Sequence, residues 1–294
     1  MTDLPNEIVG AANPDCWWCG DPADSREHQV KASDIRELFG SPPYYGDDTL
    51  SRSGTEREGE TTGVNSNLLK YGQTMCRSCN DRRSQPFDDA WTTLIRFVLS
   101  AEEAVLRARK IHLKEVYGED WEKRGLDLIR FFVKQICCVI AEKADSEIPD
   151  ELIAFLDGGS EPDSLRLQLA VDENAWQFTR WLRVSPSEAD QGGGLIFMGS
   201  NTVSKDPGST VVVNIYGWYM VRWMCVLWEY DATRDFPSTF DSPWVDLDTV
   251  HLALGKDPRV AEKFEAAVRA VESGEEPRED EDVDEFLRRL NPHS

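Results

Sequence analysis

Two short cysteine motifs decide the fold: Cys16-Trp17-Trp18-Cys19-Gly20 and Cys76-Arg77-Ser78-Cys79-Asn80. Paired Cys-x-x-Cys motifs are typical of knuckles that place four thiolates around one tetrahedral Zn²⁺. Gly20 suits the tight turn that follows such a knuckle. The alternative is that four thiols are buried separately, but two pairs rarely arise by chance in a chain with seven cysteines. The predicted ligands of a structural zinc ion are Cys16, Cys19, Cys76 and Cys79.

Composition limits the classes of protein to consider. The 294 residues are 40% hydrophobic, which is enough for a core, and the formal net charge is −22. Non-specific DNA affinity comes from Lys and Arg side chains that neutralise phosphates, so contact with nucleic acid must be local or supplied by a partner. The most apolar stretch, residues 126–141, is interrupted by Asp127, Arg130 and Lys134, so no membrane span is expected.

The N-terminus, MTDLPNEIVG, lacks the basic and apolar regions of a signal peptide, so we expect a cytoplasmic protein. In that reducing compartment paired Cys-x-x-Cys motifs favour a metal over disulfides.

The chain divides into four expected segments, and the predicted fold class is α+β. A zinc module covers residues 1–90, with an exposed polar insertion at about 42–64. A helical segment follows at 91–158, then a β-rich accessory domain at 160–255. Residues 256–294 form an acidic C-terminal helix and tail.

Apolar periodicity supports this division. The positions Leu94, Val98, Ala101, Val105 and Ala108 step by three and four, which predicts one face of a single helix. Residues 120–143 predict a second, more buried helix, and residues 150–156 predict a short third one. Alternation from Leu165 to Val171 predicts a strand, and residues 210–228 predict buried strand, although their second half could be helix.

A second set of residues lies in and beside the two knuckles. Glu27-His28 lies between the cysteine pairs, and Asn80 directly follows the second pair. The order Cys-x-x-Cys, acid-His, Asn, Cys-x-x-Cys-Asn resembles the zinc-stapled branch of the HNH endonucleases over about residues 14–90. The resemblance implies a treble-clef-like ββα-metal finger, in which a hairpin and a helix enclose a catalytic metal ion.

The resemblance also implies roles for individual residues. His28 would be the general base that activates water. Glu27 and Asn80 would be ligands of a catalytic Mg²⁺ or Mn²⁺ ion, and the middle asparagine that orients the histidine would be Asn67, with Asn65 as the alternative. This chain has Glu27 where the family commonly has Asp, and Asn80 where it often has His.

The chemistry of these residue types is consistent with phosphodiester hydrolysis. A near-neutral imidazole can take a proton from water, and a hard cation that prefers oxygen ligands can stabilise the leaving oxygen. Neighbouring side chains of a strand point to opposite faces, so the strand must end or bend at Glu27-His28 for both to reach one point. Arg82 and Arg83 are candidates for clamping phosphate, or are ordinary solvated charges.

The expected function is therefore metal-dependent hydrolysis of DNA, or less favourably RNA, in a bacterial or phage defence or restriction setting. A protein partner could bind through the β-rich domain or the acidic tail. Two other classes stay open. One is a catalytically inactive zinc module that binds protein or nucleic acid, and the other is an acidic protein that mimics DNA.

Overall fold

The computed structural model describes residues 14–44, 50–52, 59–143, 146–184, 196–199 and 202–251. The predicted acidic helix and tail at 256–294 lies outside the described residues, as do residues 45–49 and 53–58 of the predicted insertion.

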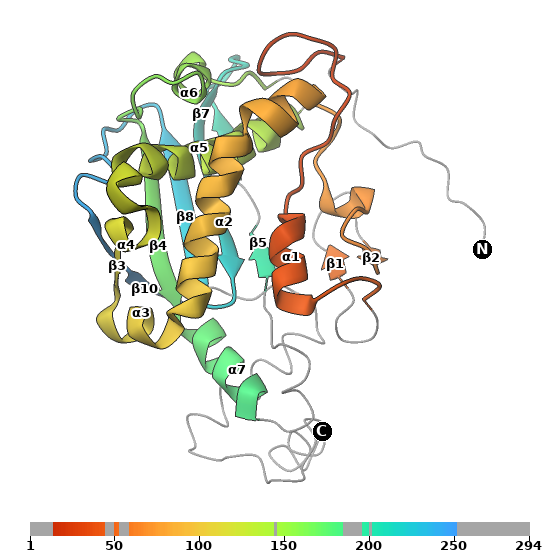
Figure 1. Cartoon of the computed structure of the whole chain (residues 1–294). Helices are drawn as coiled ribbons and strands as arrows, with labels where there is room; N and C mark the ends of the chain where they lie inside the picture. The colour runs from red at the N-terminus through yellow and green to blue at the C-terminus, as the bar shows by residue number, and fades with distance from the viewer. Residues whose placement is uncertain are drawn as a thin grey trace.

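A six-stranded sheet lies at the centre of the described part, in the order β10-β4-β8-β7-β5 with β6 also beside β7 (Figure 1). Its strands are β4 (Leu165–Asp172), β5 (Ile196–Met198), β6 (Thr202–Lys205), β7 (Val212–Val221), β8 (Met224–Asp231) and β10 (Asp248–Val250). Neighbouring strands are antiparallel except β10, which runs parallel to β4. The sheet is therefore mixed, where the sequence predicted an antiparallel one.

The β-branched and aromatic stretch at 210–228 forms most of a hairpin. Strands β7 and β8 pair from Val221 and Met224 outward, and only Arg222 and Trp223 connect them. Arg222 has φ 53°, the left-handed conformation that such a tight reversal requires. The β prediction is confirmed for this stretch, and the helical alternative for its second half is wrong.

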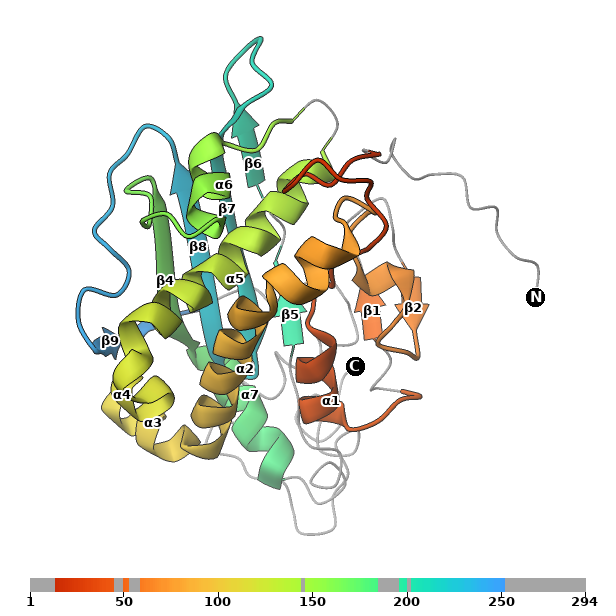
Figure 2. The same ribbon diagram turned by 45° about the horizontal axis from the view of Figure 1, so that its top comes forward.

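Helices α2 and α5 lie across one face of this sheet (Figures 1 and 2). The helices that follow residue 84 along the chain are α2 (Gln85–Ser100), α3 (Glu102–Ala108), α4 (Leu113–Tyr117), the 3-10 turn η4 (Gly118–Asp120), α5 (Trp121–Ala141), α6 (Asp150–Leu156) and α7 (Glu173–Val184).

The Trp91 ring of α2 is fully buried and stacks on Phe131 of α5, with ring centres 5.5 Å apart. Tyr219 of β7 meets the same Trp91 ring edge-on, also at 5.5 Å. Such aromatic pairs add about 0.5–1.5 kcal/mol each beyond their buried area, and here they join both helices to the sheet.

The single helix predicted through Ala108 is wrong, because the chain breaks at Ala101. Helix α2 ends at Ser100, and α3 begins at Glu102. The Glu102 side chain is buried and accepts a hydrogen bond of 2.5 Å from the indole of Trp223 in the β7–β8 turn. This tertiary contact fixes the direction in which α3 starts, and a helical periodicity does not reveal it.

The N-terminal segment, residues 14–83, is called the finger below and lies beside α2, on the side away from β4 (Figure 2). Its elements are α1 (Ala32–Phe39), β1 (Leu50–Arg52), β2 (Gly59–Thr61), the 3-10 turn η2 (Asn67–Leu69) and the π-helix η3 (Ser78–Arg83). Strands β1 and β2 pair antiparallel. A small core of its own holds this module, made of Ile35, Tyr44, Val64 and Leu69.

One larger core runs through the rest of the described residues. It extends from Cys16 and Met75 of the finger through Ile136 of α5 to Trp228 of the sheet. A further two-stranded pair, β3 (Lys110–His112) with β9 (Trp244–Asp246), joins the helical and β-rich segments. The three segments predicted at 1–90, 91–158 and 160–255 therefore pack around a common interior.

The predicted α+β class is confirmed as a mixture of helices and mixed sheets. None of the helices in the described ranges has the length and apolar character that crossing a bilayer demands.

Candidate metal centre

The four cysteines of the two knuckles meet at one place. The sulfur atoms of Cys16, Cys19, Cys76 and Cys79 all lie within 4.8 Å of one another. The Sγ atoms of Cys19 and Cys76 are 3.6 Å apart, and neither residue is in a disulfide. Four sulfurs at about 2.3 Å from a tetrahedral Zn²⁺ would be roughly 3.8 Å apart, so the cluster could hold a metal ion such as zinc.

Local backbone geometry builds each knuckle. The Gly20 N–H donates to the Cys16 carbonyl at 2.9 Å, and Gly20 has φ 77°, a conformation that glycine adopts without strain. The second knuckle leads into η3, where the Asn80 N–H donates to the Cys76 carbonyl at 3.0 Å. The first turn of η3 thereby fixes both the last sulfur and Asn80.

Arg83 covers the cysteine cluster. Its guanidinium carbon lies 4.4 Å from the centre of the Trp18 ring, and its Nη1 lies 4.0 Å from the Cys79 sulfur. Nη2 is paired with Asp157, whose carboxylate also accepts a hydrogen bond of 2.7 Å from the Trp18 indole. Arg83 was a candidate for phosphate contact, but its guanidinium group contacts the cysteine cluster and Asp157 instead. Arg82 is exposed, and within the described ranges it has no ion-pair partner.

Two antiparallel segments carry the predicted catalytic residues. The Ser25 N–H donates to Met75 and the Gln29 N–H donates to Leu69, both at 2.9 Å, while the Tyr71 N–H donates to the Glu27 carbonyl at 2.9 Å. The segment of Glu27 and His28 is therefore held against the segment that leads into the second knuckle. The chain bends directly afterwards, at residues 29–30.

Glu27 faces helix α5. Its Oε1 lies 3.0 Å from Lys134 Nζ and accepts a hydrogen bond of 3.1 Å from Gln135 Nε2. The Glu27 side chain is 12% exposed and that of Lys134 is fully buried. Burial alone would lower the pKa of Lys134, but the carboxylates of Glu27 and Asp88 raise it, so the ammonium stays charged.

His28 faces a different neighbour. Its backbone bridges Lys70, and its imidazole hydrogen-bonds to the backbone of Val64. Burial lowers the pKa of His28 to about 4, and the positive charge of Lys70 contributes, so the ring is neutral at pH 7. The Nε2 atom is buried and has no hydrogen-bond partner in the described part of the chain.

Asn80 has the same kind of unpartnered atom. Its Nδ2 donates to Ser25 Oγ at 3.0 Å, whereas its Oδ1 is buried and has no partner among the residues described. Buried polar atoms are nearly always hydrogen-bonded, so an unpartnered oxygen and an unpartnered ring nitrogen indicate places where a water molecule, an ion or a substrate can bind. An amide oxygen and a carboxylate fit a hard divalent cation, because such ions prefer oxygen ligands.

The middle asparagine is less well defined. Asn67 begins η2 and is exposed, and its carbonyl accepts a hydrogen bond of 3.3 Å from the Lys70 N–H next to the His28 bridge. Asn65 is also exposed. Asn67 therefore closes the η2 turn through its backbone, and neither side chain is directed to His28 by a hydrogen bond in the described ranges.

The cysteines come together, whereas the three predicted catalytic side chains have separate contacts. Glu27 pairs with α5, His28 with Val64, and Asn80 with Ser25; no hydrogen bond or ion pair links the three to one another among the described residues. Sequence reasoning missed Lys134, Gln135 and Asp88 as neighbours of the site. The available signal was a lysine within an apolar helix, because a buried ammonium requires acidic partners.

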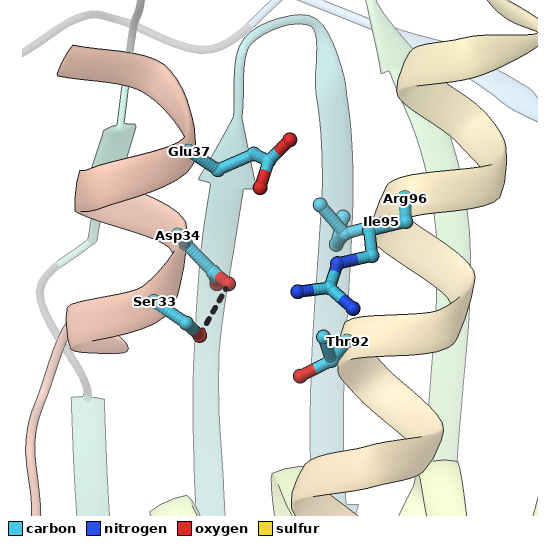
Figure 3. Close-up of a pocket in the computed structure, with 6 residues that line it drawn as sticks. All are labelled: Ser33, Asp34, Glu37, Thr92, Ile95 and Arg96. Atoms are coloured by element: carbon cyan, nitrogen blue, oxygen red, sulfur yellow. Dashed lines mark hydrogen bonds between the residues drawn. The ribbon is translucent and has the colours of Figure 1, made fainter. Parts of the chain in front are cut away.

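A separate shallow groove lies between α1 and α2. Figure 3 shows its lining, which consists of Ser33, Asp34, Glu37, Thr92, Ile95 and Arg96. The buried Asp34 carboxylate accepts hydrogen bonds from the Trp91 indole at 2.6 Å and the Tyr219 hydroxyl at 3.0 Å. Asp34 thus joins the finger to α2 and to the sheet, which is a structural role.

Comparisons with known proteins identify no relative of this chain, so the function is argued from the geometry of the site. No family model, no curated protein and no solved structure matches the chain.

Proposed function

We propose that this chain is a metal-dependent endonuclease of the HNH type that hydrolyses phosphodiester bonds, with DNA as substrate ahead of RNA. One observation carries the proposal: the resemblance assigns proton transfer to His28 and metal binding to Asn80, and His28 Nε2 and Asn80 Oδ1 are both buried and unpartnered in the described structure. The cysteine cluster holds the second knuckle, from which Asn80 projects.

The proposed structural ion is zinc, held by the four cysteines. Because these come from residues 16–19 and 76–79, a bound ion would close the long loop between them and fix the finger. The proposed second ion is Mg²⁺ or Mn²⁺, held by Glu27 and Asn80; when bound, it would supply charge stabilisation at the leaving oxygen.

The roles of the protein side chains follow from their contacts. A neutral imidazole with a free Nε2 can accept a proton from water. Exposed Arg82, two residues after Asn80 on η3, is the proposed phosphate contact. Because the net charge is −22, the affinity for nucleic acid must come from such local contacts or from a partner.

A second candidate function is a zinc module that binds without catalysis. It is favoured by the commitment of Glu27 to Lys134 and Gln135, and of Arg83 to Asp157. In this alternative the sheet domain recognises a protein or nucleic-acid partner, and the Glu27–Lys134 pair only stabilises the interior.

Plasmid nicking separates the two functions. Supercoiled DNA is incubated with the zinc-loaded full chain and Mn²⁺ or Mg²⁺, beside His28→Ala and the matched control His251→Ala, which changes an exposed histidine far along the sequence. The nuclease proposal expects divalent-dependent nicking that is lost in His28→Ala and kept in His251→Ala. Equal behaviour of wild type and His28→Ala, with zinc content and folding unchanged, would favour the binding module.

A further inference from the structure

Helix α5 contributes charged and polar groups to the finger from more than a hundred residues along the chain. Lys134 Nζ has three N–H donors and three acceptor groups within reach: Glu27 Oε1 at 3.0 Å, Asp88 Oδ2 at 3.2 Å and Ser84 Oγ at 3.3 Å. Since the Lys134 side chain is fully buried, these contacts fix the ammonium group in one position.

The same contacts reach the element that carries Asn80. The Ser84 hydroxyl donates to the Asn80 carbonyl at 2.6 Å and accepts from Lys134. Lys134 therefore bridges the Glu27 segment and the end of η3, the two places from which the proposed metal ligands come.

The carboxylate of Glu27 is held by one oxygen. Both Lys134 and Gln135 contact Oε1, while Oε2 makes no hydrogen bond to any described residue. Because only Oε1 is held, Oε2 of Glu27 stays available to a cation. The two donors, Lys134 and Gln135, set the orientation of the Glu27 carboxylate.

Charge balance favours the same arrangement. Lys31, Asp88, Lys134 and Glu27 alternate in sign, with Lys31 Nζ 3.0 Å from Asp88 Oδ1. The Lys134 ammonium therefore faces two carboxylates, those of Glu27 and Asp88. Buried ion pairs contribute little net stability compared with apolar packing, so stability alone explains this group of charges poorly.

We propose that α5 positions the Glu27 carboxylate for a divalent cation through Lys134 and Gln135, and that Lys134 also holds the Asn80 turn through Ser84. The inference rests on the proposed function. Lys134 and Gln135 are positioning residues, because they act through Glu27 and do not themselves bind the ion.

The test is calorimetric titration of Mn²⁺ into the zinc-loaded full chain, with zinc content and melting temperature measured on each sample. The variants are Lys134→Met, which removes the charge at similar length, and Gln135→Leu, which removes one neutral donor. The matched control is Arg130→Met on the same helix, since Arg130 is buried and contacts Asp127 and Phe155 but not the finger.

We expect Lys134→Met to weaken Mn²⁺ binding by about 10- to 100-fold, the range found when partners of metal ligands are removed. Gln135→Leu weakens it several-fold, Arg130→Met leaves it unchanged, and all variants keep their zinc. Unchanged affinity in both Lys134→Met and Gln135→Leu overturns the inference, as does tighter binding in Lys134→Met, which would make the lysine a competitor of the ion.

If Lys134→Met does not fold, Gln135→Leu decides, because it leaves every charge in place; unchanged affinity then overturns the inference. The two proposals fail in different ways. A wild-type chain that neither binds Mn²⁺ nor nicks DNA removes both, whereas a wild-type chain that does both, with α5 variants equal to the control, removes only the positioning role.

Discussion

The Arg83 guanidinium lies over the Trp18 ring, with its carbon 4.4 Å from the ring centre. Trp18 lies inside the first cysteine knuckle and Arg83 lies four residues after the second, so this contact joins the two halves of the cysteine cluster. A tetrathiolate zinc site carries a net negative charge, and Arg83 is the cation that approaches the Cys79 sulfur, at 4.0 Å.

We predict that Arg83→Leu speeds the loss of zinc to a chelator. The substitution removes a positive charge beside the thiolates and a cation–π contact worth about 0.5–2 kcal/mol. The measurement is the rate of zinc release followed with a colorimetric chelator. Arg82→Leu is the control, because Arg82 is exposed and has no ion-pair partner in the described ranges. Equal release rates in the two variants would contradict a role for Arg83 at the centre.

The cysteine cluster itself gives the second prediction. Cys79→Ser should lower the zinc content from one ion per chain to a small fraction and lower the melting temperature, because a structural zinc contributes directly to folding. Cys137→Ala is the control, since Cys137 is fully buried but lies outside the cluster. Cobalt substitution provides an independent measurement, because four thiolates around Co²⁺ give intense sulfur-to-metal absorption. A purified wild-type chain without bound metal, or zinc retained in Cys79→Ser, is the opposite outcome.

Asp34 gives a prediction about pH. Burial raises the pKa of its carboxyl above the ordinary value of 3.8, although the Trp91 indole, Lys31 and the Tyr219 hydroxyl oppose the rise. The folded chain therefore keeps a proton on Asp34 at pH values where the unfolded chain has lost it. Because the folded state binds more protons, the Asp34 contribution to stability falls as pH rises from 3.8 to the folded-state pKa.

Replacing Asp34 with asparagine should remove this dependence. The amide oxygen can still accept from Trp91 and Tyr219, while Asp34→Ala leaves both donors buried and costs about 1–3 kcal/mol for each unmet group. Glu37 and Arg96, which line the same groove, are unchanged in both variants. The free energy of unfolding in urea, measured from pH 4 to 8, checks the prediction, with exposed Asp89→Asn as control. If the free energy of unfolding depends on pH in the same way in Asp34→Asn and in wild type, Asp34 does not cause the pH dependence of stability.

Local patterns predicted much of this structure correctly. The helix at 120–143, the helix at 150–156 and the strand from Leu165 to Val171 were predicted from the local sequence, and they appear as α5, α6 and β4. The four cysteines were predicted to meet because two Cys-x-x-Cys pairs have a common chemical purpose, and their sulfurs do cluster.

The features that escaped prediction depend on contacts between distant residues. Helix α7 starts after Asp172, whose carboxylate caps the Ala175 N–H at 2.8 Å within a region predicted to be β. Beside the break at Ala101, Glu102 accepts a hydrogen bond from Trp223, and Glu27 pairs with Lys134. Trp223 and Lys134 lie far along the chain from the residues that they contact. Asp172 is local: it is an N-cap residue, but the alternating pattern of the strand before it hid this signal.

Asn80 provides the last prediction. Its Oδ1 is buried and unpartnered in the described structure, so Asn80→Asp places a carboxylate at an atom that is proposed to bind a divalent ion. Without divalent ion the new buried charge should destabilise the chain, since an uncompensated buried charge costs several kcal/mol. With Mn²⁺ it should bind the ion more tightly than wild type, because a carboxylate attracts a divalent cation more strongly than an amide does. The signature is therefore a crossing of two curves: a lower melting temperature than wild type without Mn²⁺, and a larger rise when Mn²⁺ is added.

Asn65→Asp is the matched control for Asn80→Asp, because Asn65 is exposed and the substitution adds the same charge at the surface. It should shift neither curve appreciably. Asn80→Ala should lose Mn²⁺ binding while it keeps zinc, because the Asn80 side chain is not one of the four sulfur ligands. If Asn80→Asp melts lower than wild type by the same amount with and without Mn²⁺, the unpartnered oxygen is not a cation ligand, and the binding-module function becomes the better account of the finger.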